Sequence, residues 1–381
     1  MELSKTTQIK IAFFSALPPF RGGISSFSRL LVNALKGKSL IEAFTFKKQY
    51  PNFLFPGESQ FSKNSEASFP RIITSYNPLT YFKAGLKLKK VNPDVFVVNY
   101  WMPFFAPMYA FLASRFSNSV LKVALIHNLT PHEERFFDRY LNRMFVKSFD
   151  AFVVLSEKVN QDLLSYRPGA ISKVIPHPTY AQFGSRKDFQ VAREYFNIDK
   201  EAKVLLFFGL IREYKGLDIL IEAMNQLDEG YVLLIAGEIY GDKNKYMKAI
   251  EAIHKAKVII HDKFIPDKDV AHYFSAADCC ILPYKSGTQS GIQAIATSFE
   301  LPVLVSKNAG LHESIADGKN GFVIEELTPL ALSDKIQNLF SGGKLQVVQE
   351  QLLLQNNSKL DEWSSFADDF MHFISLEKSK K

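Results

Sequence analysis

The sequence predicts an α/β protein of two domains, each built on a parallel sheet with helices on both faces. Apolar runs alternate with helical patterns along the chain, an order that favours βαβ units. The runs are continuously apolar, as expected of strands buried on both faces. At 381 residues the chain exceeds what one core usually covers. The predicted strands are 10–15, 95–99, 121–126, 151–155, 173–175, 204–208, 231–236, 258–260, 278–282, 302–306 and 321–324.

A polar, turn-rich stretch near residues 178–200 marks the predicted domain boundary, and a fresh strand begins at Val204. We therefore assign residues 1–182 to an N-terminal domain and 183–358 to a C-terminal domain. Residues 359–381 are predicted to form one amphipathic helix. Its aromatic stripe is assigned to core packing and consists of Trp363, Phe366, Phe370 and Phe373. Helices are also predicted at 25–35, 135–148, 157–165, 217–227, 245–255 and 289–299.

The positive charge is concentrated in the N-terminal part. The net charge is +7, and residues 1–100 hold 14 Lys/Arg against 5 Asp/Glu. Lysines and apolar residues share a predicted helix there, which suits an anionic membrane surface. An ordinary surface helix with snorkelling lysines explains the pattern equally well. Nucleic acid is not an expected partner, because no recognition signature accompanies the charge. The lysines are Lys83, Lys87, Lys89 and Lys90.

The chain is expected to be cytoplasmic. Cys279 and Cys280 are adjacent, so their side chains point to opposite faces of a strand, and a disulfide framework is excluded. No secretory signal is visible at the N-terminus. Residues 95–114 are uncharged and long enough to span a bilayer. The prolines at 103 and 107 instead favour a short strand, a loop and a buried helix from about Pro107.

The most informative stretch is VLLFFGLIREYKGLDILIEA, residues 204–223. It predicts a buried strand ending at Gly209, a loop carrying Arg212 and Lys215, and a helix. Ligands bind at strand ends of open α/β sheets. Arg can fork onto two phosphate oxygens and Lys adds a point charge, so the pair suits a diphosphate. A solvated basic loop is the alternative.

Two further strand ends carry candidate residues in the N-terminal half. Gly22 and Gly23 precede a helix whose expected cap is Ser25 or Ser26, and a helix start next to glycines favours an anion. The pattern is not GxGxxG, and a plain tight turn is the alternative. A second loop follows Ile126, and His at such a position can bind a sugar hydroxyl or move a proton. This loop contains His127, Asn128, His132 and Glu133.

A third candidate loop follows the strand 278–282. Its small polar residues open a helix, where free backbone N–H groups and hydroxyls can hold phosphate or ribose. The loop includes Thr288, Gln289, Ser290 and Gly291. Asp267 and Asp269 have the spacing of a metal-binding DxD. They fall at an expected helix start, however, where the helix dipole stabilises carboxylates. No metal site is predicted, since no ligand set with suitable spacing is present.

Several of these segments together resemble the family 4 glycosyltransferases, retaining enzymes of the GT-B fold. The resemblance implies two Rossmann-like domains facing across a cleft, with the final helix crossing back to the N-domain. It implies that Arg212 and Lys215 bind the donor diphosphate, that Gly23 lies near it, and that His127 lies near the transferring sugar. The segments that show the resemblance are FFGLIREYKG, LPYKSGTQSG, FELPVLVSKNAGLHESIADGKNGFVI, PPFRGGIS, IHNLTPHE and VIPHPTYAQFG.

The chain departs from the family pattern at the E-x7-E element, which the loop from Thr288 to Gly291 begins. Thr288 stands where the first Glu is expected, and the second, expected near Ile295 or Ala296, is also missing. In the family these glutamates contact the donor sugar and the ribose. The Thr-Gln-Ser-Gly sequence is similar to a branch of sugar transferases in surface polysaccharide synthesis. The departure leaves the donor open.

The expected activity is a retaining transfer from a nucleotide-diphosphate sugar to a glycan or lipid-linked acceptor, with no cofactor and no metal requirement. Arg212 and Lys215 would neutralise charge on the leaving diphosphate. The protein would lie on the inner face of the cytoplasmic membrane, with its basic N-domain against the anionic lipid. Two alternatives remain open. One is a nucleotide-sugar epimerase or phosphorylase of the same fold, and the other is a non-catalytic sugar-nucleotide-binding protein.

Overall fold

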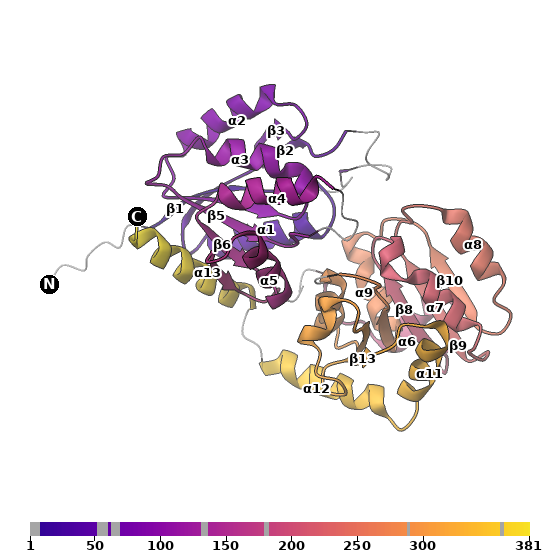
Figure 1. Ribbon diagram of the computed structural model, residues 1–381. Helices are drawn as coiled ribbons and strands as arrows, with labels where there is room; N and C mark the ends of the chain where they lie inside the picture. Colours follow the sequence, from indigo (N-terminus) through magenta and orange to yellow (C-terminus); the bar gives the residue numbers. More distant parts are fainter. Residues whose placement is uncertain are drawn as a thin grey trace. The chain divides into compact units, whose positions relative to one another are not determined.

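The computed structural model divides the chain into two compact units (Figure 1). The N-terminal unit comprises residues 1–178 and 361–381, and the C-terminal unit residues 179–360. We describe each unit by itself. The structure describes residues 8–51, 60–61, 69–130, 136–178, 183–287, 290–358 and 362–381.

The N-terminal unit contains a seven-stranded parallel sheet of order β3-β2-β1-β4-β5-β6-β7. The predicted parallel α/β architecture is confirmed. The strands β2 and β3 were not predicted because polar residues interrupt their apolar runs; β3 is an edge strand and β2 is its inner neighbour. β7 begins two residues earlier than predicted. The strands are β1 (Lys10–Phe14), β2 (Leu40–Lys48), β3 (Arg71–Thr74), β4 (Val95–Tyr100), β5 (Leu121–Ile126), β6 (Ala151–Val154) and β7 (Ile171–Val174).

Helices cover both faces of this sheet. Alternate strand residues such as Phe14, Val98 and Ile126 join one core with α2, α3 and α4, which lie side by side in that order (Figure 1). On the other face α1 packs against α13, the final helix. The aromatic stripe predicted for this last helix is buried. The helices are α1 (Gly23–Leu35), α2 (Leu79–Lys90), α3 (Ala106–Ala113), α4 (Asp138–Lys147), α5 (Glu157–Tyr166) and α13 (Glu362–Ser379).

The uncharged stretch 95–114 folds as predicted into a strand, a turn and a buried helix. β4 occupies its first six residues and is buried along its whole length. A 3-10 turn, η2 (Pro103–Phe105), leads into α3, so the two prolines fall at helix starts, where a missing N–H costs little. Of the helices that the structure describes, none has the length and apolarity needed to cross a bilayer.

The C-terminal unit contains a six-stranded parallel sheet of order β10-β9-β8-β11-β12-β13. Cys279 and Cys280 lie in β11 as free buried thiols. The strands are β8 (Lys203–Phe208), β9 (Tyr231–Ala236), β10 (Lys257–His261), β11 (Cys279–Leu282), β12 (Val303–Ser306) and β13 (Phe322–Ile324). The helices are α6 (Phe189–Glu194), α7 (Leu217–Met224), α8 (Lys243–Glu251), α9 (Asp267–Ala276), α10 (Gly291–Ser298), α11 (Pro329–Leu339) and α12 (Lys344–Ser358).

Candidate functional site

The C-terminal unit places Arg212 and Lys215 at the carboxyl end of β8, beside the point where strand order reverses. β8 lies between β9 and β11, so the chain leaves it in one direction and returns on its other side. Such switch points are where open α/β sheets bind ligands. The backbone passes from β8 through Gly209 into a 3-10 turn, η4 (Glu213–Lys215), and α7 begins two residues later.

Lys215 is buried near the end of β8 and is only 8% exposed. Its ammonium lies 5.4 Å from the centroid of the Tyr284 ring. At Gly209 a Cβ would lie 3.5 Å from the Lys215 Nζ and 2.9 Å from Cδ1 of Ile292. Gly216 has a φ of 70°, and a Cβ there would lie 2.0 Å from the Pro283 carbonyl oxygen. The two glycines therefore let the loops after β8 and β11 close around the lysine.

Neither Arg212 nor Lys215 forms an ion pair with any residue that the structure describes. Burial, and then the charge of Arg212, lower the pKa of Lys215 to about 8, against a smaller opposing contribution from Cys280. Arg212 is half-buried, with its guanidinium 5.4 Å from the Tyr240 ring centroid. A buried ammonium beside a second cation is costly to keep charged, and an anion would offset that cost. The pair can therefore hold a phosphate or diphosphate.

The loop after β11 borders the same place. Tyr284 is buried, and its hydroxyl lies 3.3 Å from the Ser290 Oγ. Ser290 caps α10 by accepting a hydrogen bond from the Ile292 N–H at 3.2 Å, and Gly291 is the first helical residue. The Lys285 N–H donates to the Tyr214 carbonyl at 2.7 Å, which joins this loop to η4. Tyr284 therefore contacts both Lys215 and Ser290, and the first turn of α10, which begins at Gly291, packs against Gly209.

Four predicted site residues cannot be placed. Thr288 and Gln289 lie outside the described residues, as do His132 and Glu133. At the positions where the family's second Glu is expected, Ile295 is 6% exposed and Ala296 is fully buried. Apolar packing on α10 therefore occupies those positions.

In the N-terminal unit, Gly22 and Gly23 lie at the start of α1, just past the carboxyl end of β1. The expected cap at Ser25 or Ser26 is wrong, because the helix begins two residues earlier, at Gly23. Gly22 is the N-cap, with a φ of 106° and no side-chain capping bond. A Cβ at either glycine would meet nothing within 4 Å, so the first turn of α1 faces open space. This turn offers backbone N–H groups to an anion.

His127 directly follows β5 and is buried against α1. Its ring meets Phe27 edge-on, with centroids 4.6 Å apart, and Phe27 also contacts His177 at 5.0 Å and Trp363 at 5.1 Å. Burial and the nearby His177 hold the pKa of His127 well below its usual value. Burial lowers the pKa of His177 to about 4. Both imidazoles are therefore neutral near pH 7 and can exchange hydrogen bonds without carrying charge.

Asn142 fixes the loop that carries His127 and the half-buried Asn128. It is fully buried on α4, donates to the Leu129 carbonyl at 2.7 Å and accepts from the Tyr100 hydroxyl at 2.6 Å. The His127 N–H donates to the Tyr100 carbonyl at 2.8 Å. The histidine is therefore held by both strand and helix. Sequence reasoning missed Asn142 and His177, although the placement of His177 between two prolines at the domain junction was a usable signal.

The neutral histidine pair should make the N-terminal unit sensitive to acid. Both pKa values are lower in the folded state, so below pH 6.5 the unfolded chain binds more protons, and stability falls as pH falls toward about 4. We expect a loss of up to about 1.4 kcal/mol per pH unit for each histidine. Urea unfolding followed by tryptophan emission measures this unit, because both tryptophans, Trp101 and Trp363, belong to it.

The matched variants for this experiment are His177→Gln and His254→Gln. Removing His177 should flatten the pH dependence by about one proton. Removing the exposed His254 of the other unit should leave it unchanged. An identical slope in wild type and His177→Gln would show that this histidine is not held neutral by the fold.

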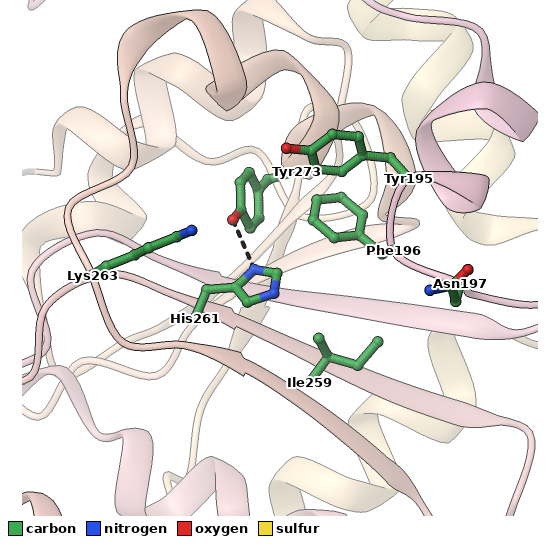
Figure 2. A pocket seen from close by; sticks show the side chains of 7 residues that line it. All are labelled: Tyr195, Phe196, Asn197, Ile259, His261, Lys263 and Tyr273. Atoms are coloured by element: carbon green, nitrogen blue, oxygen red, sulfur yellow. Dashed lines mark hydrogen bonds between the residues drawn. The ribbon is translucent and has the colours of Figure 1, made fainter.

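A separate hollow of about 280 Å³ lies beside the edge strand β10 (Figure 2). Its walls include the His261 and Tyr273 side chains, whose Nδ1 and hydroxyl oxygen are 2.7 Å apart. None of its lining residues is among Lys215, Gly209, Tyr284 and Ser290 described above. Asp267 and Asp269 lie in the first turn of α9, as expected from the dipole, and no three His, Cys, Asp or Glu side chains among the described residues are grouped to hold a metal.

Two family models match the chain. "Glycosyl transferases group 1" matches residues 188–351, and "Glycosyltransferase Family 4" matches residues 58–180. Arg212, Lys215, Ser290 and Gly291 fall within the first match, and His127 falls within the second. Between them the two models take in most of both structural units.

Among curated relatives, a D-inositol 3-phosphate glycosyltransferase of Corynebacterium urealyticum is 22% identical over 62% of this chain and 59% of its own length. A lipopolysaccharide 1,2-N-acetylglucosaminetransferase of Salmonella typhimurium is 29% identical over 45% of this chain and 47% of its own length. The matched stretch thus spans about half of each relative.

The fold matches solved structures over nearly the whole chain. The Anabaena protein HepE, solved in complex with UDP and glucose, superposes with a TM-score of 0.73 at 15% identity, covering 96% of this chain and 99% of that one. This match and the paired parallel sheets show the GT-B fold, and the two family models identify the chain as a member of the group 1, family 4 glycosyltransferases.

Proposed function

We propose that the protein transfers a sugar from a nucleotide-diphosphate sugar to an acceptor, and that Arg212 and Lys215 bind the donor diphosphate. The observation that carries this proposal is a buried ammonium, next to a guanidinium, with no carboxylate partner among the described residues. A buried cation without a counterion destabilises a fold. The phosphates of a donor would supply the missing negative charge at a strand end where such ligands bind.

The same two cations would assist the chemistry. Negative charge grows on the diphosphate as the bond to the sugar breaks, and cations fixed in place stabilise it without reorganisation. Arg212 would fork onto two oxygens and Lys215 would act as a point charge, so we propose a metal-independent transfer. We further propose retention of configuration, since attack from the face of the departing diphosphate needs no carboxylate nucleophile. His127, held neutral, would donate or accept a hydrogen bond at the transferring sugar.

We propose that the donor is a UDP-sugar and that the acceptor is a glycan or a lipid-linked molecule. The HepE structure holds UDP and glucose, which supports a UDP-sugar. The Salmonella relative is named for its action on lipopolysaccharide, which supports a surface-glycan precursor. We propose that the protein works in the cytoplasm as a peripheral protein of the membrane's inner face.

Radiolabelled UDP-, GDP- and ADP-sugars, each with and without membrane lipid, test the proposal. We expect label to move into lipid or glycan from one of these donors, with the anomeric configuration retained by NMR and activity persisting in a chelator. Isomerisation of the sugar without acceptor would indicate an epimerase instead. Tight binding without turnover across the panel would indicate a non-catalytic protein.

The affinity for the donor should depend on pH through Lys215. Its pKa is about 8 without ligand, and bound phosphates would raise it. Below pH 8 the lysine is already charged, so its contribution should be constant. Above pH 8 binding must take up a proton, and we expect affinity to fall by up to about tenfold per pH unit. Calorimetric titration from pH 7 to pH 10 measures this. Lys215→Met should bind weakly and lose the dependence.

A further inference from the structure

Helix α2 presents an exposed stripe that combines apolar and cationic side chains. Leu79 is 84% exposed, Phe82 57% and Leu86 51%. Lys83, Lys87 and Lys90 are exposed between and beside them at helical spacing. The opposite side of α2 is buried in the core through Tyr81 and Leu88. The apolar stripe therefore faces away from the sheet and is not part of the core.

Helix α4 repeats the arrangement. Phe136, just before the helix, is 96% exposed, and Tyr140 is 72% exposed. Arg139, Arg143 and Lys147 are exposed on the same side, at steps of three and four residues. The inner side of α4 carries Phe145 and Val146 into the same core as α2. Exposed aromatic rings of this size are costly in water, and grouped ones mark interaction surfaces.

The two stripes belong to one helical layer. α3 lies between α2 and α4 on the same face of the sheet (Figure 1). Within these three helices the sole carboxylate is Asp138, and it is 7% exposed. Every exposed charge of the layer is therefore positive. We call the exposed residues of α2 and α4 the cationic face.

We propose that the cationic face docks the protein on an anionic lipid bilayer. Lysine and arginine side chains bind anionic headgroups, and neighbouring apolar side chains insert among the first acyl carbons. The cationic face has both kinds of side chain. The exposed apolar side chains favour a bilayer over nucleic acid, since phosphate backbones need cations but no apolar contact. They are Phe136, Leu79, Phe82 and Leu86. Rings such as Tyr140 favour the level of the headgroups.

A hydrogen bond connects the docking surface to the loop that carries His127. Asn142, on the inner face of α4, bonds the carbonyl of Leu129, two residues beyond His127. A bilayer that holds α4 would therefore hold the loop carrying His127 near the lipid. This link rests on the proposed function, because it assumes a lipid-linked acceptor. The docking deepens the membrane association proposed above and does not require that the protein transfers a sugar.

Vesicle co-sedimentation tests the inference. The full-length protein should bind vesicles of phosphatidylglycerol and phosphatidylcholine, and should bind phosphatidylcholine vesicles far more weakly, at about 0.1 M salt. Lys83→Gln/Lys87→Gln/Lys90→Gln should lower the affinity for anionic vesicles on the order of a hundred-fold. Phe136→Ser/Tyr140→Ser should weaken it by roughly tenfold or more and leave it sensitive to salt.

The matched control is Lys245→Gln/Lys248→Gln/Lys255→Gln, which removes the same charge from exposed positions of the C-terminal unit. Equal binding by wild type and the α2 variant, an equal loss in the control, or displacement from vesicles by duplex DNA would each overturn the inference. Calorimetry with UDP should give the same donor affinity in all variants. Failure of UDP, GDP and ADP alike to bind, with vesicle binding intact, would contradict the proposed sugar transfer and leave the docking unaffected.

Discussion

Arg212→Ala/Lys215→Ala is expected to lower sugar transfer by at least about a thousand-fold while the protein stays folded. Both cations would face the departing diphosphate, and each is worth far more in a dry site than in water. Lys215 is 8% exposed, so no solvent would replace its charge. Initial rates with saturating donor and acceptor measure the loss. Each single variant should lie between wild type and the pair.

Stability separates this chemical effect from unfolding. Lys215 is a buried cation without a carboxylate partner among the described residues, so removing its charge should cost little stability. Calorimetric unfolding of the double variant should show a Tm close to that of wild type. Lys245→Ala/Lys248→Ala, two exposed lysines of α8, is the control and should keep full activity. Transfer at the wild-type rate in Arg212→Ala/Lys215→Ala would refute the diphosphate assignment.

Arg193→Met is expected to destabilise the C-terminal unit by about 3–5 kcal/mol near pH 7. The Arg193 side chain is 2% exposed and pairs with Asp278 at 2.8 Å. It also donates to the carbonyls of Ala276, Asp199, Lys200 and Ala202. Methionine would keep the volume but take the cation from the Asp278 carboxylate, which would retain the Val204 N–H at 2.7 Å, and the donor from these carbonyls. Circular dichroism in urea measures the loss, while tryptophan emission reports the other unit separately.

The pH dependence of this variant identifies the cause. Burial already raises the pKa of Asp278 although Arg193 opposes the shift. Without Arg193 the folded pKa should rise further, so the folded state binds more protons than the unfolded state, and part of the stability should return as pH falls. Lys257→Met, on the surface of the same sheet, should change stability by less than about 0.5 kcal/mol. A loss independent of pH would point to packing instead of charge.

The fold was largely predictable where strands are buried on both faces. β8, β9 and β11 are uninterrupted apolar runs, and each was placed within a residue or so. β2 and β3 were not predicted because their buried runs are short: β3 is a four-residue edge strand, and β2, its inner neighbour, has exposed or half-buried residues at both ends. The apolar periodicity of β2 does not identify it as a strand. Its pairing with β1, a contact between distant segments of the chain, determines that it forms one.

The candidate site was predictable as a set of residue types but not as an environment. The spacing of Arg212 and Lys215 after a strand is visible in the sequence. The burial of Lys215 is not, because it depends on Gly216 meeting the Pro283 carbonyl, a contact between segments far apart in the chain. The prediction of the α1 cap was wrong for a related reason. Gly22 is the N-cap and makes no side-chain hydrogen bond, so the serines that follow it were misleading.

A crystal structure with a bound nucleotide sugar tests the central claim most directly. We expect the donor diphosphate at the end of β8, with its oxygens about 3 Å from the Lys215 ammonium and the Arg212 guanidinium. Ser290 and the first turn of α10 should border the same ligand. A donor bound elsewhere, with both cations remote from its phosphates, would contradict the assignment.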